Sequence, residues 1–493
     1  MKLILLVFLL PIVAVGQSAQ TEACRETTDK TIKVIVKPDS VHSTRPITEA
    51  LKAFKPGLNL IIEVQSGTYR GENGIAIDNG GICLLGKGKP LIQRTKFDNE
   101  TDEPSIIKVS SVSDVVIAGF ELVGVISKNN CPVGPIGVAV VNFSKRKISD
   151  IRIADNLIHT IGQDYAAQCV DTNGDEIVKQ AHGIQVVSNE YPVENITIDH
   201  NTLKNLRLGE SEAITLGGRI YDFTVTSNSI SDVDNIGIDV IGQSEDTSFQ
   251  AKKGRIAWNK VFDLKPGNSA YPFVAGIYID GGTGSSWEEN ITIENNTVTN
   301  FGIGISVGSE NNYCDKDGTE NSKHLCPVLT QFIRIDNNII SGNKLYGIGI
   351  GKDVFDDEDH QNSRTWNVRI TGNSVTGNVV SPTHKEYGQV QFGSLEKESL
   401  KSIELRSNVI TTSSNGSLLV GITGSPKKKY LIPDVSFYDN QFFDDSEINY
   451  VWSWGESDTE LKRYKKSHLV APGSQHIKLP KEIEGANNLW KPF

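Results

Sequence analysis

The stretch Gly276-Ile277-Tyr278-Ile279-Asp280 is one of six similar short segments in the middle of the chain. In each segment two aliphatic residues alternate with small or polar residues, which is the period-2 pattern of a strand with one buried face. The other copies are Gly183–Val187, Ala213–Gly217, Gly237–Ile241, Gly304–Gly308 and Gly347–Gly351. Repetition of one strand within a chain of 493 residues predicts a repeat architecture rather than several unrelated domains.

A second repeat places an asparagine after an aliphatic strand. Its nine members are Asn156, Asn201, Asn228, Asn259, Asn296, Asn338, Asn373, Asn408 and Asn440. Their spacings run from 27 to 45 residues, and a period in this range indicates a solenoid or a propeller. A propeller blade needs four strands and about 40 residues, so the 27-residue copy favours one turn of a three-stranded coil. Stacked about 4.8 Å apart, the asparagines would form a structural ladder at one corner.

These features resemble the right-handed parallel β-helix proteins of the pectate-lyase-like superfamily. The resemblance covers roughly residues 30–440 and rests on the asparagine series, the Gly-Ile-x-Ile strands and Ser66-Gly67-Thr68-Tyr69. It implies an all-β fold: a single-stranded right-handed parallel β-helix, a three-sheet solenoid, with an N-terminal helical cap. The family includes polysaccharide lyases, glycoside hydrolases, epimerases, tailspikes and adhesins. The chain lacks the Asn-Thr-Asp motif of galacturonases and the Trp-x-Asp-His stretch of many pectate lyases, so neither substrate carries over.

The two ends of the chain predict how the coil is bounded. Lys2 followed by the 13 apolar or small residues Leu3–Val15 is typical of a secretory signal, and this run is too short to span a membrane. Pro46 and the apolar stripe that starts at Ile47 predict a short helix. We therefore expect a signal peptide at 1–16, a leader and cap at 17–57, the β-helix at 58–440 and a C-terminal cap or tail at 441–493, in a secreted monomer.

The cysteines indicate disulfide bonds, and the net charge limits the classes of ligand that the protein could bind. In an exported protein an even number of cysteines favours disulfides; the pairs we prefer among 15 possible connectivities are Cys314–Cys326, Cys131–Cys169 and Cys24–Cys83. The net charge of −11 argues against nucleic acid as a partner. It also disfavours a polyanionic substrate, unless calcium or a local basic patch intervenes.

Glycines and acids mark the Gly-Ile-x-Ile sheet as the candidate site. Period-2 alternation places one column of glycines on its outward face, where missing side chains would leave a groove for a polysaccharide; alternatively, the glycines serve bends next to the strands. The column comprises Gly183, Gly237, Gly276, Gly304 and Gly347. Asp239 and Asp280 lie in this bare region on neighbouring turns, with Cβ atoms expected about 8 Å apart. Glycoside hydrolysis uses two carboxyl groups at such a separation, and Glu310, on the next turn, is the third catalytic candidate.

Other side chains would assist at this face. The candidates for substrate binding are Tyr278, Arg219, Gln185 and Trp287, and Glu212 is a weaker acidic candidate. Asp353 and Asp356, in an acidic loop, could hold calcium, although hydrolysis requires no cofactor.

Two alternatives to hydrolysis remain open. A polysaccharide lyase would remove a proton from a uronate, and six residues lie near enough to act as its base or cation: His182, Arg219, Lys252, Lys253, Arg255 and Tyr278. A non-enzymatic carbohydrate-binding or adhesion solenoid would need no cluster of acids.

Overall fold

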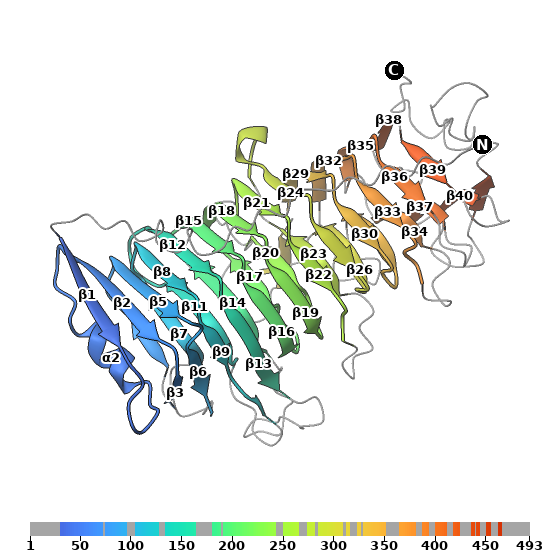
Figure 1. Cartoon of the computed structure of the whole chain (residues 1–493). Helices are drawn as coiled ribbons and strands as arrows, with labels where there is room; N and C mark the ends of the chain where they lie inside the picture. The colour runs from blue at the N-terminus through green and yellow to red at the C-terminus, as the bar shows by residue number, and fades with distance from the viewer. Residues whose placement is uncertain are drawn as a thin grey trace, which may run out of the picture.

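The computed structural model describes residues 30–465 with gaps. The gaps are 72–73, 96–103, 128–133, 164–179, 189–190, 243–249, 266–273, 282–283, 309–311, 316–322, 327–328, 352–363, 381–386, 394–399, 412–417, 424–434, 439, 444–449 and 455–461. Over this range the chain coils through three long sheets whose strands lie side by side along one axis (Figure 1). Successive strands visit sheet A, then sheet B, then sheet C, so that each turn of the coil adds one strand to every sheet. The fold is the right-handed parallel β-helix that the repeats predict.

The strands of each sheet are hydrogen-bonded in sequence order, except that β10 pairs with β13 beside the main path of sheet B. Sheet A contains β1 (Thr31–Val36), β2 (Asn59–Gln65), β5 (Ile82–Lys87), β8 (Val115–Ala118), β12 (Ile148–Ala154), β15 (Val193–Asp199), β18 (Ile220–Thr226), β21 (Gly254–Ala257), β24 (Ile291–Glu294), β29 (Leu329–Asp336), β32 (Arg364–Thr371), β35 (Leu400–Arg406) and β38 (Val435–Tyr438). Sheet B contains β3 (Thr68–Gly71), β6 (Leu91–Arg94), β9 (Glu121–Val123), β10 (Ile126–Ser127), β13 (Leu157–Gln163), β16 (Thr202–Arg207), β19 (Ser229–Val233), β22 (Lys260–Phe262), β25 (Thr297–Thr299), β30 (Ile339–Ser341), β33 (Ser374–Thr376), β36 (Val409–Thr411) and β39 (Gln441–Phe443).

Sheet C carries the Gly-Ile-x-Ile segments. It contains β4 (Ile75–Ile77), β7 (Ser105–Ser110), β11 (Ile136–Asn142), β14 (His182–Ser188), β17 (Ile214–Gly217), β20 (Ile238–Ile241), β23 (Ala275–Asp280), β26 (Ile303–Gly308), β31 (Tyr346–Gly351), β34 (Gly388–Gly393), β37 (Leu418–Thr423), β40 (Tyr450–Trp454) and β41 (Lys462–Lys465). A separate hairpin pairs β27 (Asn312–Asp315) with β28 (Lys323–Cys326), which is the loop expected to hold Cys314 and Cys326.

Aliphatic side chains on the inner face of each sheet stack from turn to turn. In sheet A, for example, Ile198, Val225, Ile256 and Ile293 occupy one register position on successive strands and are all fully buried. Together the inner faces form one continuous apolar core that extends from Val36 to Val435. The alternating aliphatic residues therefore mark the inner face of the strands, and the residues between them point away from the core.

The predicted asparagine ladder is confirmed at all nine positions, at the corner between sheets A and B. The side-chain oxygen of each asparagine from Asn201 to Asn440 accepts hydrogen bonds from the preceding asparagine's main-chain N–H and side-chain amide, at 2.8–3.1 Å. The same amides also donate to main-chain carbonyls, as Asn259 does to Val225. The ladder satisfies the polar groups of a buried corner that repeats in every turn.

Both ends of the coil differ from the expected boundaries. At the N-terminal end β1 already pairs with β2, so sheet A begins at Thr31, inside the segment expected to form the cap. The helix α2 (Arg45–Leu51) buries Ile47, Ala50 and Leu51 and packs against the first strands of the coil. At the other end β39 and β40 continue sheets B and C beyond Asn440, and β41 then pairs antiparallel with β40. The repeat in sequence fades before the coil ends because the last strands no longer carry the Gly-Ile-x-Ile pattern.

Candidate functional site on the outer face of sheet C

Asp239 and Asp280 lie on the outer face of sheet C. Asp239 stands between Ile238 and Val240, which both belong to the core, so its carboxylate points away from the core. Its side chain is nevertheless only 2% exposed. In the register, Asp239 is opposite Thr215 on one neighbouring strand and Tyr278 on the other.

Asp280 is half-buried and lies on the strand next to Asp239, displaced by two residues along it. Since adjacent strands are about 4.8 Å apart and two residues span about 6.6 Å, the two Cβ atoms are separated by about 8 Å. The two residues thus lie on one face of one sheet, on adjacent strands.

A chain of hydrogen bonds crosses the neighbouring strands of the same face. Gln185 Nε2 lies 3.0 Å from His182 Nε2, His182 Nδ1 lies 2.8 Å from Thr215 Oγ1, and the Thr215 hydroxyl donates to Glu212 Oε2 at 2.8 Å. These contacts are satisfied by a neutral imidazole protonated on Nδ1, which donates to Thr215 and accepts from the Gln185 amide. These hydrogen bonds orient Gln185, a predicted substrate-binding residue that lies two strands away from Asp239.

His182 should make the stability of the protein depend on pH. Burial lowers the pKa of its imidazole from 6.5 to about 4, although a hydrogen bond with the Glu212 backbone acts in the opposite direction. Between these pH values the unfolded chain binds a proton that the folded chain does not. The stability contributed by His182 is therefore complete above about pH 6.5 and declines towards pH 4, by up to about 3 kcal/mol.

Denaturant unfolding at pH 7.5 and at pH 4.5 checks this dependence. We expect His182→Gln to lose less stability between the two pH values than the parent protein. The exposed His42 lies outside the chain of hydrogen bonds, and its substitution His42→Asn serves as the control. Equal losses for His182→Gln and the parent would contradict the assignment.

The glycine column does not form the bare outward groove that alternation predicts. A Cβ atom added to these glycines would meet buried aliphatic side chains of sheet B at 2.3–2.6 Å. Gly276, for example, would touch Val298 and Gly237 would touch Val261. The register of sheet C skips these positions, as between Ala275 and Ile277, because the chain turns the corner from sheet B there. The glycines are therefore required by packing at the corner, and the prediction that they line a groove is wrong.

Alanine substitutions distinguish glycines of sheet C that are packed at the corner from a glycine with free space around it. Gly276→Ala would place its Cβ 2.3 Å from Val298 Cγ1, so we expect a loss of about 1–3 kcal/mol in unfolding free energy. Gly217→Ala is the matched control, because the nearest atom to its added Cβ lies 3.9 Å away. Thermal unfolding of both variants measures the difference, and equal melting temperatures would contradict the packing role of Gly276.

Three further sequence candidates have a defined place. Tyr278 is 5% exposed and packs in a small apolar cluster with Ala275, Ile303 and Tyr346 on the outer face, so its ring is largely covered. Arg219 follows β17 at the corner that leads to sheet A. Trp287 lies in the 3-10 turn η1 (Trp287–Glu289), between β23 of sheet C and β24 of sheet A.

Trp287 packs against sheet A instead of standing beside Asp239. Its ring is edge-on to Phe332 at 5.3 Å between centroids and lies 4.0 Å from the Arg369 guanidinium. Its expected place beside the acid pair is therefore not observed, because the chain has already left sheet C after Asp280.

Glu310, Asp353 and Asp356 lie outside the described residues, so their predicted roles stay predictions. Within the described part of the chain, no three His, Cys, Asp or Glu residues are grouped as a metal site. Cys83 is disulfide-bonded, and the proposed pairing with Cys24 likewise lies outside the described residues. No helix in the described ranges is long and apolar enough to cross a membrane.

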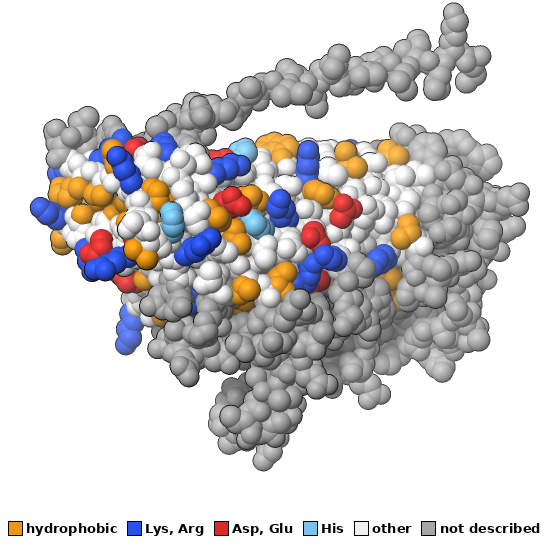
Figure 2. All heavy atoms as spheres, turned by 60° about the horizontal axis from the view of Figure 1, so that its bottom comes forward, with side chains coloured by type: hydrophobic (Ala, Val, Ile, Leu, Met, Phe, Trp, Pro, Cys, Tyr) orange, Lys and Arg blue, Asp and Glu red, His pale blue; other side chains and the backbone are white. Residues whose placement is uncertain are grey.

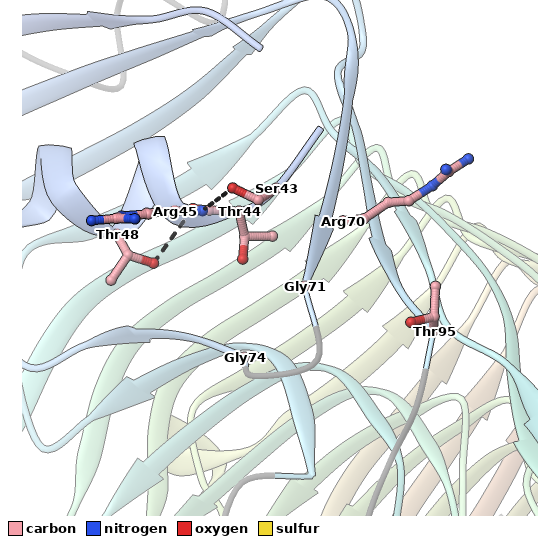
Figure 3. A pocket seen from close by; sticks show the side chains of 8 residues that line it. All are labelled: Ser43, Thr44, Arg45, Thr48, Arg70, Gly71, Gly74 and Thr95. Atoms are coloured by element: carbon pink, nitrogen blue, oxygen red, sulfur yellow. Dashed lines mark hydrogen bonds between the residues drawn. The ribbon is translucent and has the colours of Figure 1, made fainter. Parts of the chain in front are cut away.

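Two cavities of the described surface lie away from the acid pair. One, of about 570 Å³, is at the N-terminal end of the coil; Figure 3 shows its two arginines, Arg45 and Arg70, extending in opposite directions. The other, of about 820 Å³, lies at the corner between sheets A and B, beside Lys87, Lys89 and His200. Figure 2 shows lysine and arginine side chains interspersed with acidic ones on the described part of the face turned forward.

Comparison with known proteins supports the fold and leaves the chemistry open. No protein-family model matches the chain. The uncharacterized protein YwoF of Bacillus subtilis is 27% identical over 322 residues, which are 62% of this chain and 59% of that protein. The chain thus matches less than two thirds of the length of this curated relative.

Solved structures share the fold at low identity. A tailspike protein of E. coli bacteriophage HK620 in complex with a pentasaccharide has a TM-score of 0.50 and 12% identity, over 87% of this chain and 63% of the tailspike. The mannuronan C-5 epimerase A-module of Azotobacter vinelandii has a TM-score of 0.42 and 11% identity, over 84% of this chain and 95% of that module. The likeness to the tailspike agrees with the three parallel sheets and establishes the parallel β-helix fold.

Proposed function

We propose that this chain is a carbohydrate-active enzyme that cleaves glycosidic bonds of a polysaccharide on the outer face of sheet C. The observation that carries the proposal is the placement of Asp239 and Asp280 on adjacent strands of one face, about 8 Å apart at Cβ. Asp is disfavoured within strands, and Asp239 is a buried carboxylate in the middle of one. A fold shared with a tailspike solved with a pentasaccharide supports a glycan as the ligand.

The mechanism uses the two carboxyl groups in complementary roles. One protonates the oxygen of the leaving sugar, while the other acts either as a base on water or as a nucleophile at the anomeric carbon. A Cβ separation of about 8 Å allows carboxyl separations that suit both the retaining and the inverting reaction. In this proposal Glu310 assists the pair from the following turn.

Polar groups around the pair would bind and orient the sugar. Gln185 is held by His182, so its amide is preorganised for a substrate hydroxyl. Arg219 stands at the end of the same sheet, and Tyr278 supports the strand beside Asp239. Calcium bound by Asp353 and Asp356 would serve binding or stability rather than bond cleavage, and EDTA should then lower affinity or melting temperature.

A polysaccharide panel tests the reaction class. The purified protein is incubated with neutral and acidic polysaccharides while new reducing ends and ultraviolet absorbance are followed together. We expect reducing ends without new absorbance, since hydrolysis leaves no double bond. New absorbance from an unsaturated uronate would instead identify a lyase, and retained binding without either signal would identify an adhesion solenoid.

The same proposal places the enzyme outside the cell. Residues 1–16 would be removed as a signal peptide, and the mature protein would act as a secreted monomer on its polysaccharide. N-terminal sequencing of the protein from culture medium should then begin at residue 17, and an intact Met1 would contradict this.

A further inference from the structure

Sheet A contains an aromatic residue in a backbone conformation that disfavours it. In most strands of sheet A the residue just before the inner pair has φ between 51° and 61°, in the left-handed region, whereas Asn290 before β24 has φ of −64°. At the described positions of this column these residues are Asp114, Asp150, Asn195, Asp222, Lys253, Phe332, Asn367 and Ser402. Asn and Asp tolerate this conformation, whereas a bulky residue there is an outlier. Strain retained by a bulky residue in a column filled mostly by Asn and Asp is a reason to look for function around Phe332, although Trp258, at another position beside sheet A, has a similar φ of 54°.

Phe332 holds a tryptophan at the surface of sheet A. The ring of Trp287 meets Phe332 edge-on at 5.3 Å, and the Arg369 guanidinium lies 4.0 Å from the Trp287 centroid. All three side chains are partly exposed. An aromatic ring fixed by a neighbouring ring and a cation is well suited to stack on the apolar face of a sugar.

A second tryptophan continues this surface on the neighbouring strands. Trp366 lies directly opposite Gln331 and Lys401 in the register of sheet A. The Arg364 guanidinium is 5.6 Å and the Lys401 ammonium 5.2 Å from its ring centroid. We name the six side chains the sheet A patch: Trp287, Phe332, Arg364, Trp366, Arg369 and Lys401.

The sheet A patch is basic although the whole chain carries a net charge of −11. Arg369 is near one carboxylate, that of Glu404, at 3.9 Å. Across the described residues no carboxylate lies within 4.0 Å of the exposed Arg364 or Lys401. Among the described residues, three cations near aromatic rings have one carboxylate within 4.0 Å, and this balance favours an anionic ligand with flat apolar faces.

We propose that the sheet A patch binds a carboxylated polysaccharide, as a surface distinct from the acid pair on sheet C. Sugar rings would stack on Trp287 and Trp366, and their carboxylates would pair with Arg364 and Lys401. The patch is the local basic surface that an acidic chain needs in order to accept a polyanion. The proposal does not depend on cleavage at sheet C, since it concerns binding alone.

Affinity electrophoresis in gels with polygalacturonate, and with dextran as the neutral probe, tests the proposal. All proteins carry Asp280→Asn, so that cleavage cannot shorten the probe. We expect polygalacturonate to retard the protein and the triple variant Arg364→Gln, Trp366→Ala, Lys401→Gln to bind at least tenfold more weakly. Trp258→Ala is the control, since Trp258 is an exposed tryptophan beside Arg255 at the corner between sheets A and B.

Phe332→Asn separates a binding role from simple packing. Asn fits the left-handed conformation, so the melting temperature should equal or exceed that of the parent, while retardation by polygalacturonate should weaken several-fold. A lower melting temperature with unchanged retardation would overturn the role given to Phe332. Unchanged retardation of the triple variant, equal retardation by dextran, or equal competition by duplex DNA would overturn the proposal as a whole.

Discussion

Asp239→Asn is expected to slow glycosidic bond cleavage by about 10²–10⁴-fold, and Asp280→Asn to slow it by a similar factor. Asparagine has the size of aspartate, so neither substitution leaves a cavity on sheet C, but its amide can neither give nor take the catalytic proton. Initial rates of reducing-end release on the best substrate of the panel measure the effect. The double variant should be little slower than either single variant, because the two groups act as one unit.

A matched control separates the loss of a catalytic group from the loss of a negative charge at any surface position. Asp78 is an exposed carboxylate just after β4 of sheet C, far from the pair along the coil. Asp78→Asn should keep the parent rate. Full activity of Asp239→Asn and of Asp280→Asn on a substrate that the parent cleaves would refute the site, provided that all variants share the parent's melting temperature.

The largest effect on stability is expected in the asparagine ladder. Asn259→Ala removes the acceptor of the Asn228 main-chain N–H and the donor to the Val225 carbonyl, and it leaves Asn296 Oδ1 without one of its bonds. Each buried group left without its partner costs about 1–3 kcal/mol. We therefore expect a loss of about 3–5 kcal/mol in unfolding free energy.

Urea unfolding followed by circular dichroism measures this loss. Asn290→Ala is the control in the same part of sheet A, since the described contact of its side chain is one bond of 3.3 Å to Thr292 at a half-buried site. A midpoint for Asn259→Ala no lower than that of Asn290→Ala would show that the ladder does not hold the corner together.

Sequence repetition predicted the coil because every turn buries the same kind of aliphatic face and the same polar corner. The asparagine spacing located nine corners, and the aliphatic alternation identified the inner face of the strands. A second, shorter ladder was missed, in which Asn343 and Asn378 bond through Asn378 Oδ1 and Asn378 bonds on to Gln389. Its signal was present, because Asn343 and Asn378 each follow a member of the main ladder by five residues.

Other features of the site could not be found from the period alone. His182 and Glu212 each directly precede a Gly-Ile-x-Ile copy or its variant, which suggests neighbouring positions but not the hydrogen-bonded chain through Thr215. Alternation also assigned the glycine column to the outside, and the structure turns it towards the core. A period describes a straight strand, whereas these residues sit where the chain bends between sheets.

The sequence by itself determined the architecture of this protein. A single coil is the arrangement that buries the alternating aliphatic face of every strand and also pairs the polar groups of a corner repeated in every turn. It also placed Asp239 and Asp280 on one face, because their strands are consecutive copies of a repeat with fixed register. Only the tertiary structure decided what surrounds them: the covered Tyr278, the neutral His182, and Trp287 on sheet A. Which side chains become neighbours across strands depends on the path that the backbone takes at each corner. The corners differ in length, so no sequence period predicts that path.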